Sequence, residues 1–276
     1  MNNKIFGVDL IQSKSNSTVT ELSKLLNKKY REQRKLFLCD GIKLFLEAVE
    51  FNADIKYIIL ENNTAFSNEI VQKIKECVEK GAIILCVEGY IFAKMTSENS
   101  PQGIITVCGF YDKMHSFLAN AENNENDSII MLQSIRDPGN MGTIMRNAVA
   151  LGIDRLVLSS DCVDIYSPKV IRASMGAIFK IKVDVVSDFL GSIEVFKSGG
   201  RRVLSAALDD NALILGKDSL KRDDIVILGN EGHGISDDVI RVSTNTLFIP
   251  MRENTESLNV AMASAIIMWE ISNKFN

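Results

Sequence analysis

The second half of the chain alternates short apolar runs with segments of helical periodicity, and this alternation constrains the fold more than any other feature. The run at 128–135 is mostly apolar on both faces, as in a strand buried within a parallel sheet. Ile144, Ala148 and Leu151 then recur at helical spacing, and Gly152 follows them. Strands that alternate with helices predict a parallel α/β sheet. Further strands are expected at 155–159, 179–183, 202–206, 225–229 and 246–249, and a last helix at 259–273.

The first part of the chain shows the same alternation on a smaller scale. Thr18 and Glu21 have the spacing of a capping box, and an apolar stripe follows between Leu22 and Tyr30, so a helix is expected to begin at Thr18. Gly81 is placed to end a helix that covers 70–78. Strands are expected at 36–39, 55–60, 82–87 and 103–108.

A polar segment separates these two parts. Residues 119–127 are nearly free of apolar side chains, which is the composition of a linker. A chain of 276 residues is long enough for two domains. We therefore expect one domain at 1–118, a linker at 119–127 and a second domain at 128–276.

The composition favours a cytoplasmic protein without a membrane segment. Hydrophobic residues make up 46% and charged residues 24%, as in ordinary globular proteins. The longest apolar stretch near the C-terminus, 260–269, is interrupted by Ser264 and is shorter than the about 20 residues of a membrane span. The N-terminal residues lack the layout of a secretion signal.

Several common kinds of site are disfavoured. Five cysteines are an odd number and none form a C-x-x-C pair, so we expect free thiols and no metal site. Two histidines leave little material for a His-dependent triad. Neither domain has a G-x-G-x-x-G after its first strand, and the chain lacks a phosphate loop and a nucleophile elbow.

The charge is acidic overall and basic in two places. The net charge of −4 argues against a general nucleic-acid coat protein but leaves room for a local basic patch. Residues 21–35 hold six Lys or Arg against two Glu. Residues 167–180 hold Lys169, Arg172 and Lys180 with no acid. Each cluster alone fits a solvated helix face as well as a binding surface.

Three turns rich in glycine or asparagine each follow an expected strand, at 137–142, 228–234 and 249–260. Ligands of open α/β sheets bind at loops beyond the carboxyl ends of the strands, so the three turns are expected to meet there. Glycine lets the backbone approach a ligand closely. Such a pocket can hydrogen-bond an adenine edge without charged side chains.

These three segments, in this order, closely resemble the motifs of the SpoU (TrmH-like) RNA ribose methyltransferases of the SPOUT superfamily. The resemblance covers about residues 128–276. The segment 167–179 is typical of two-domain members, and 28–34, 37–42 and 101–103 resemble their small RNA-binding domain.

The resemblance implies a fold and a cofactor. The fold is α/β: a SPOUT-type parallel sheet with a C-terminal trefoil knot, a rare feature among proteins, plus a small N-terminal α/β RNA-binding domain. The implied cofactor is S-adenosylmethionine. The implied assembly is a homodimer with active sites near the interface.

The resemblance also assigns residues by their position within the motifs. The expected catalytic residues are Asn140 and Arg146 in the first motif, Glu231 in the second, and Ser257 and Asn259 in the third. Asn140 can also serve as a turn residue, and Asn259 as the N-cap of the last helix. The expected cofactor contacts come from Leu228, Gly229, Ile249, Met251 and Leu258.

The implied reaction moves a methyl group from S-adenosylmethionine to a ribose 2′-hydroxyl. Arg146 resembles the catalytic arginine of the family. Because a guanidinium keeps its proton up to a pH of about 12, we expect a cation that holds phosphate and stabilises a developing alkoxide. Its role in removing the hydroxyl proton stays open.

Structured RNA, and ribosomal RNA first, is the expected substrate, since this type of N-terminal domain is common in the ribosomal RNA enzymes of the family. A transfer RNA ribose methyltransferase, a catalytically silent RNA-binding relative and an unrelated nucleotide-binding protein are the alternatives. Tyr30 could stack on a base. The candidate phosphate contacts are Lys28, Lys29, Arg31, Arg34, Lys35, Lys169 and Arg172.

Overall fold

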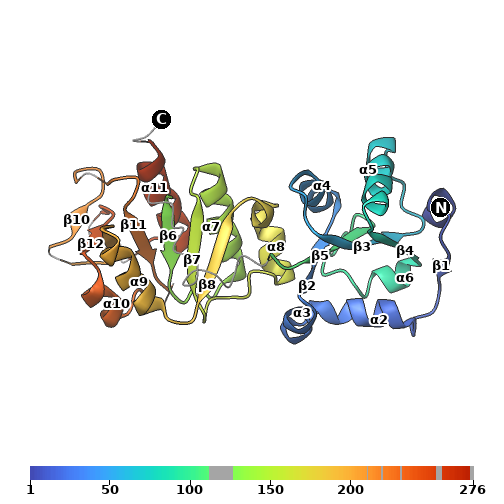
Figure 1. Ribbon diagram of the computed structural model, residues 1–276, viewed down its shortest axis with the longest axis horizontal. Coiled ribbons are helices and arrows are strands. Elements are labelled where there is room, and N and C mark those ends of the chain that lie inside the picture. The colour runs from blue at the N-terminus through green and yellow to red at the C-terminus, as the bar shows by residue number, and fades with distance from the viewer. Residues whose placement is uncertain (112–126, 210, 219, 231, 253–256, 274–276) are drawn as a thin grey trace. The chain divides into compact units, whose positions relative to one another are not determined.

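The computed structural model describes residues 1–111, 127–209, 211–218, 220–230, 232–252 and 257–273. Contacts divide the chain into two compact units (Figure 1). The N-terminal unit consists of Met1–Tyr111 and Asp164–Phe179. The C-terminal unit consists of the described residues of Asp112–Val163 and Lys180–Asn276.

The N-terminal unit is built on a mixed sheet of five strands in the order β1-β4-β3-β5-β2. Strands β1, β4 and β3 are parallel, and β5 is antiparallel to both β3 and β2. The strands are β1 (Leu10–Ile11), β2 (Leu36–Asp40), β3 (Ile55–Glu61), β4 (Ile83–Val87) and β5 (Ile104–Gly109). The helices are α1 (Asn2–Phe6), α2 (Ser17–Ser23), η1 (Lys24–Leu26), α3 (Lys28–Arg34), α4 (Ile42–Glu50), α5 (Asn68–Glu79), α6 (Gly89–Phe92), α8 (Pro168–Ser174) and η3 (Ala177–Phe179).

This sheet separates two apolar cores, because successive side chains of a strand point to opposite faces. On β3, Ile59 packs in the core covered by α2 and α6. Its neighbours Ile58 and Leu60 pack in the core covered by α4 and α5. Figure 1 shows these helix pairs on opposite sides of the sheet.

The first basic region folds as three short helices instead of the single helix that its apolar stripe predicts. Helix α2 begins at Ser17 because the side chain of Asn16 accepts a hydrogen bond from Val19 N at 3.1 Å. The expected start at Thr18 with a capping box is therefore wrong, because Asn16, a residue type that is also favoured as an N-cap, caps the helix instead. Asn27 caps α3 in the same way, through Lys29 N at 3.0 Å.

The segment that contains α8 groups by its contacts with the N-terminal unit, although its chain position lies inside the domain expected at 128–276. The ring of Tyr166 stacks on Phe110 with centroids 3.8 Å apart and lies 4.8 Å from the ring of Phe37. Ser167 caps α8 and Pro168 is its first residue, as expected. Residues 119–126 of the expected linker lie outside the described residues.

The C-terminal unit contains the expected parallel sheet, with seven strands in the order β10-β12-β9-β11-β6-β7-β8. The strands are β6 (Ile129–Leu132), β7 (Arg155–Ser159), β8 (Lys182–Val186), β9 (Val203–Ala206), β10 (Leu213–Ile214), β11 (Ile225–Leu228) and β12 (Asn245–Phe248). The helices are α7 (Pro138–Ala150), α9 (Phe189–Ser198), α10 (Asp237–Val242) and α11 (Val260–Asn273).

Helices lie on both sides of this sheet, α9 and α10 toward the viewer in Figure 1 and α7 and α11 behind it. Ile129 and Met131 of β6 pack in the core that α9 and α10 cover. Helices α7 and α11, more than a hundred residues apart in sequence, are joined by a hydrogen bond from Asn147 Nδ2 to Ala261 O at 3.2 Å.

Strand β8 lies three residues later than the expected 179–183, because Ala177–Phe179 forms a 3₁₀ turn. Strands β1 and β10 have two residues each and were not expected from the sequence. The trefoil knot stays a prediction. Among the described residues, no helix has both the length and the apolar character that a membrane crossing needs.

Replacing Arg31 tests the interaction that holds the α8 segment. The guanidinium is 4% exposed and donates to Asp164 Oδ2 at 2.6 and 3.1 Å and to Leu25 O at 2.7 Å. We expect Arg31→Ala to lower the free energy of unfolding by about 3–5 kcal/mol, because the largely buried side chain of Asp164 loses its partner. Urea unfolding followed by circular dichroism measures this change.

The matched control is Lys28→Ala. Lys28 lies on the same helix, pairs with Glu32 at 3.6 Å and is 57% exposed, so the loss should be within about 1 kcal/mol. Equal losses for the two variants would contradict the assigned role of Arg31.

Candidate active site

A pocket of about 270 Å³ lies at the carboxyl ends of three neighbouring strands, β9, β11 and β12. All strands of the sheet are parallel, so their carboxyl ends meet at one edge, where ligands of such sheets bind. The residues that line the pocket are Ala206, Ala207, Leu208, Leu228, Gly229, Asn230, Gly232, Gly234, Leu247, Phe248, Ile249, Met251, Ser257, Leu258, Val260 and Ala263.

The loop after β11 folds back on itself so tightly that Gly229 has no room for a side chain. A Cβ at Gly229 would lie 2.3 Å from the carbonyl carbon of Gly234. Asn230 and Gly234 exchange two backbone hydrogen bonds of 2.9 Å. The side chain of Asn230 also accepts from Gly232 N at 2.8 Å. The pocket therefore has a wall of fixed backbone groups on this side.

The same asparagine joins this loop to the turn that follows β6. Asn230 Nδ2 donates to Ser134 O at 2.8 Å. Gln133 and Ser236 add two further bonds, at 2.9 and 3.0 Å. Ser134 has a φ of 58°, in the left-handed region that residues other than glycine seldom adopt. A conformation of this kind persists only where the surroundings fix it.

Asp161 helps to hold Ser134 in this conformation. Its carboxylate accepts from Ser134 Oγ at 2.6 Å, Ser159 Oγ at 2.5 Å and Arg136 Nη2 at 2.7 Å. Burial alone raises the pKa of Asp161, but these hydroxyl bonds and the charge of Arg136 outweigh burial, so the pKa lies below its ordinary value. Asp161 thus stays ionised and holds the turn that leads into α7.

The first and third expected motifs meet through two asparagines. Asn140 lies in the first turn of α7, where its backbone N donates to the capping Asp137 at 2.7 Å. Asn259 caps α11 by accepting a hydrogen bond from Ala261 N at 2.9 Å, which confirms the N-cap expected there. Asn259 Nδ2 also donates to Asn140 Oδ1 at 3.0 Å, although 119 residues separate the two.

The other expected catalytic residues occupy different surroundings. Arg146 is exposed on α7 and, within the described residues, makes no hydrogen bond or ion pair. Its guanidinium is available to an anion. Ser257 lines the pocket. Glu231 lies outside the described residues.

The structure brings the five expected cofactor residues together. Leu228, Gly229, Ile249, Met251 and Leu258 all line the one pocket, although two strand ends and a helix start supply them. Residues 206–208, at the carboxyl end of β9, line the same pocket and were not expected from the sequence. The rule that strand carboxyl ends carry the site could have found them, because this strand was expected at 202–206.

The expected RNA contacts all lie in the N-terminal unit. Lys28, Lys29, Arg34, Lys35 and Lys169 are exposed. Arg172 is exposed but bonded to Glu98 at 2.6 Å. Arg31 differs from the expectation, because it is buried and committed to Asp164, which leaves no donor facing solvent for a phosphate.

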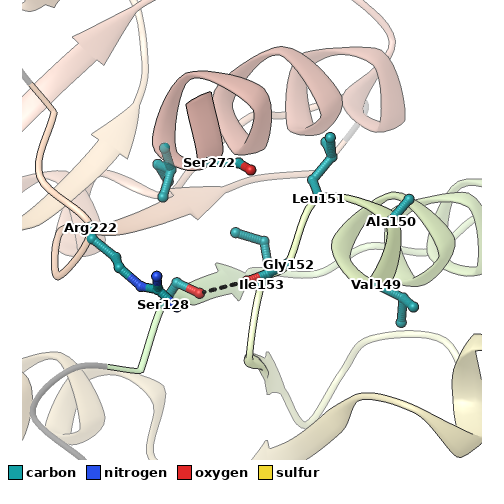
Figure 2. Close-up of a pocket in the computed structure, with 9 residues that line it drawn as sticks. Ser128, Val149, Ala150, Leu151, Gly152, Ile153, Arg222 and Ser272 are labelled. Carbon is teal, nitrogen blue, oxygen red and sulfur yellow. Dashed lines mark hydrogen bonds between the residues drawn. The ribbon is translucent and has the colours of Figure 1, made fainter. Parts of the chain in front are cut away.

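A second cavity of about 340 Å³ lies near the opposite edge of the same sheet (Figure 2). It is lined by the start of β6, the C-terminal ends of α7 and α11, and Arg222. Figure 2 shows Ser128 Oγ donating to Gly152 O, at 3.3 Å. None of the expected site residues lines this cavity. The part of the chain that the structure describes contains no cluster of His, Cys, Asp or Glu fit to hold a metal ion.

Comparisons with known proteins bear on both units. The profile of the SpoU rRNA methylase family matches residues 127–269, and that of an MRM3-like substrate binding domain matches residues 16–106. The chain is 29% identical over 264 residues to a 23S rRNA (guanosine(2553)-2′-O)-methyltransferase, RlmP, of Bacillus subtilis. That match covers 95% of this chain and 98% of the relative.

Solved structures show the same fold. The AdoMet-bound rRNA methyltransferase from Sinorhizobium meliloti superposes with a TM-score of 0.84 at 24% identity, over 97% of this chain and 98% of that one. The SpoU methyltransferase AviRb from Streptomyces viridochromogenes, in complex with AdoMet, gives 0.79 at 21%, over 94% and 98%.

Replacing Gly229 tests the close backbone approach in the pocket wall. We expect Gly229→Ala to lower the free energy of unfolding by about 1–3 kcal/mol, because the new Cβ forces the loop backbone apart. The control is Gly232→Ala in the same loop, whose Cβ would meet only Asn230 Oδ1 at an ordinary 3.5 Å. Chemical unfolding of both variants measures the difference, and a harmless Gly229→Ala would show that the loop relaxes freely.

Proposed function

The chain belongs to the SpoU rRNA methylase family, and we propose that its pocket binds S-adenosylmethionine for methylation of a ribose 2′-hydroxyl in ribosomal RNA. One observation carries the assignment of the site. Residues from the three motifs converge on one edge of the sheet: six of the expected site residues line the pocket, and Asn259 is bonded to Asn140. The relative from Bacillus subtilis, which matches along nearly its whole length, supports the substrate class.

The residues present fit this cofactor. Leu228, Ile249 and Leu258 give the pocket apolar walls for an adenosine. The backbone of Gly229, Asn230 and Gly234, held in place by the mutual bonds of Asn230 and Gly234, gives the pocket a fixed polar wall for the adenine edge. When bound, S-adenosylmethionine supplies an electrophilic methyl group on a sulfonium.

The chain's own residues then align and stabilise the acceptor. The ribose oxygen must lie in line with the methyl carbon, and this alignment supplies much of the rate. Asn140 and Asn259 hold the starts of α7 and α11 together beside the pocket. Arg146 would hold the neighbouring phosphate and stabilise the negative charge that develops on the ribose oxygen as the C–O bond forms and the C–S bond breaks. A guanidinium cannot accept a proton, so the hydroxyl proton passes to solvent. Glu231 and Ser257 complete the proposed catalytic set.

The N-terminal unit is the proposed RNA-binding part. The exposed Lys28, Lys29, Arg34, Lys35 and Lys169 are its proposed phosphate contacts, with Arg172 available where Glu98 releases it. Phosphate contacts give affinity without sequence selection. The net charge of −4 then implies weak binding to unrelated RNA.

A homodimer is part of the proposal. Met262, Ile266 and Trp269 lie at i, i+4 and i+7 on α11 and are 57%, 41% and 57% exposed. An apolar stripe of this kind marks an interface more often than a free surface. It begins three residues after the capping Asn259, so a partner subunit there would border the pocket. The cytoplasm is the proposed location, since a ribosomal RNA substrate is found there.

Arg146→Ala tests the catalytic assignment. We expect kcat to fall by about 10²–10³, as for the loss of one group that stabilises transition-state charge. The affinity for S-adenosylmethionine should not change, because Arg146 does not line the pocket. The assay uses methyl-labelled S-adenosylmethionine and total RNA from a strain that lacks the gene, with alkali-resistant linkages as the mark of ribose methylation.

The control is Arg241→Ala, another exposed arginine, on α10 of the same unit. Near-normal turnover of Arg146→Ala would overturn its role. Label in transfer RNA instead of ribosomal RNA would keep the chemistry and replace the substrate. Wild-type protein that binds no cofactor and transfers no label would favour a silent RNA-binding relative.

Trp269→Glu tests the dimer. A charge within an apolar interface should convert the dimer to a monomer, seen by light scattering coupled to gel filtration. Val195→Glu is the control, since Val195 is 43% exposed on α9, outside the stripe. A wild-type protein that is monomeric at assay concentration, or a dimer that tolerates Trp269→Glu, would contradict the proposal.

A further inference from the structure

The N-terminal unit holds a cavity of its own, of about 260 Å³. Its floor is apolar: Leu22 and Leu25 are buried, and Leu36 and Tyr57 pack on the same core. Ser17, Thr18, Glu21 and Arg34 complete the lining. Helices α2, η1 and α3 and strands β2 and β3 supply these residues, so the basic segment at 21–35 contributes to the lining of the cavity.

A carboxylate held between two cations lies at this cavity. Glu21 Oε1 is 2.5 Å from Lys24 Nζ, and Glu21 Oε2 is 2.8 Å from Arg34 Nη2. The hydrogen bond from Lys24, with the one from Arg34, lowers the pKa of Glu21 below its ordinary value. The lining therefore offers a charged acceptor and a guanidinium donor next to each other.

Further cations lie close to Arg34 in the sequence. Lys29 and Lys35 are exposed on and just after α3, within one or two turns of Arg34. Lys24 Nζ lies 5.5 Å from the centre of the Tyr30 ring. A group that enters this cavity from an RNA strand thus has cations nearby for the phosphates on either side of it.

We propose that this cavity receives one unstacked base of the substrate RNA, guanine or cytosine, with Glu21 accepting from its amino group and Arg34 donating to its carbonyl oxygen. The inference rests on the proposed function, because it takes RNA as the substrate. The volume is slightly below the about 300–1,000 Å³ of pockets for drug-sized ligands, which suits a single planar ring without its sugar and phosphate.

The chemistry of the lining selects among the bases. Proteins read single-stranded RNA by taking unstacked bases against aromatic or guanidinium groups and bonding their edges. Carboxylates read amino groups, and arginine reads base oxygens. Guanine and cytosine carry both groups, whereas adenine lacks a carbonyl oxygen and uracil lacks an amino group. This base contact gives the N-terminal unit a sequence preference that its phosphate contacts cannot give.

Ser17→Trp tests the cavity by filling it, with Thr20→Trp as the matched control. Both residues are exposed on α2, but only Ser17 lines the cavity. We expect Ser17→Trp to raise the KM for ribosomal RNA about tenfold, within the range for loss of one base contact, with kcat nearly unchanged. Thr20→Trp should leave both constants unchanged, and circular dichroism checks that each variant is folded.

Ultraviolet crosslinking of the wild-type protein to the same RNA, without cofactor, gives a readout that does not need activity. Mass spectrometry of the crosslinked peptides should find Tyr57 joined to a guanine or a cytosine, and Ser17→Trp should remove that crosslink. A crosslink at Tyr57 to adenine or uracil, or none in residues 17–36 and 57, would overturn the inference even if methyl transfer proceeds. Failed methyl transfer with this crosslink intact would overturn the proposed function instead.

Discussion

The parallel direction of all seven strands in the C-terminal sheet is the constraint on which the site depends. After each strand, the connecting segment carries the chain back across the sheet, so every strand runs toward the same edge. The ends of strands that are distant in sequence therefore lie side by side. The ends of β9, β11 and β12 therefore form one pocket. An antiparallel strand at any of these places would send its loop to the other edge, where the cavity beside Arg222 lies and no expected site residue is found.

Hydrogen bonds, one close backbone approach and one strained residue fix the loops at this edge. Gly229 permits an approach of the chain to Gly234 that no other residue allows. Ser134 accepts a left-handed conformation because Asp161, Ser159 and Asn230 bond to its hydroxyl, its N–H and its carbonyl respectively. Neither position contacts a reacting group in the proposed mechanism. Both keep the pocket wall and the start of α7 in a fixed relation, which a reaction that depends on alignment requires.

The sequence predicted those parts of the fold that local patterns specify. Strands with apolar runs, the end of α7 within two residues of Gly152 and the caps at Ser167 and Asn259 follow from residue types within a few positions. Asn16 and Thr18 are both good caps, and their sequence does not decide between them. The grouping of α8 with the N-terminal unit was missed for a different reason. It depends on Tyr166 stacking on Phe110 and on Asp164 pairing with Arg31, contacts between residues more than 50 positions apart.

The basic cluster at 21–35 illustrates why charge alone could not define the RNA contacts. The cations of this cluster are all lysines or arginines close together in the sequence, yet packing gives them different roles. Arg31 is buried and structural because the turn from η1 to α3 points it at Asp164. Arg34, one turn later, reaches Glu21 at the surface, and Lys29 has no such partner among the described residues. Removal of one partner from a buried ion pair is strongly destabilising, whereas an exposed pair contributes little and its partners can separate at little cost. The division between fold and recognition within this cluster is thus set by burial, which the pattern of charges does not reveal.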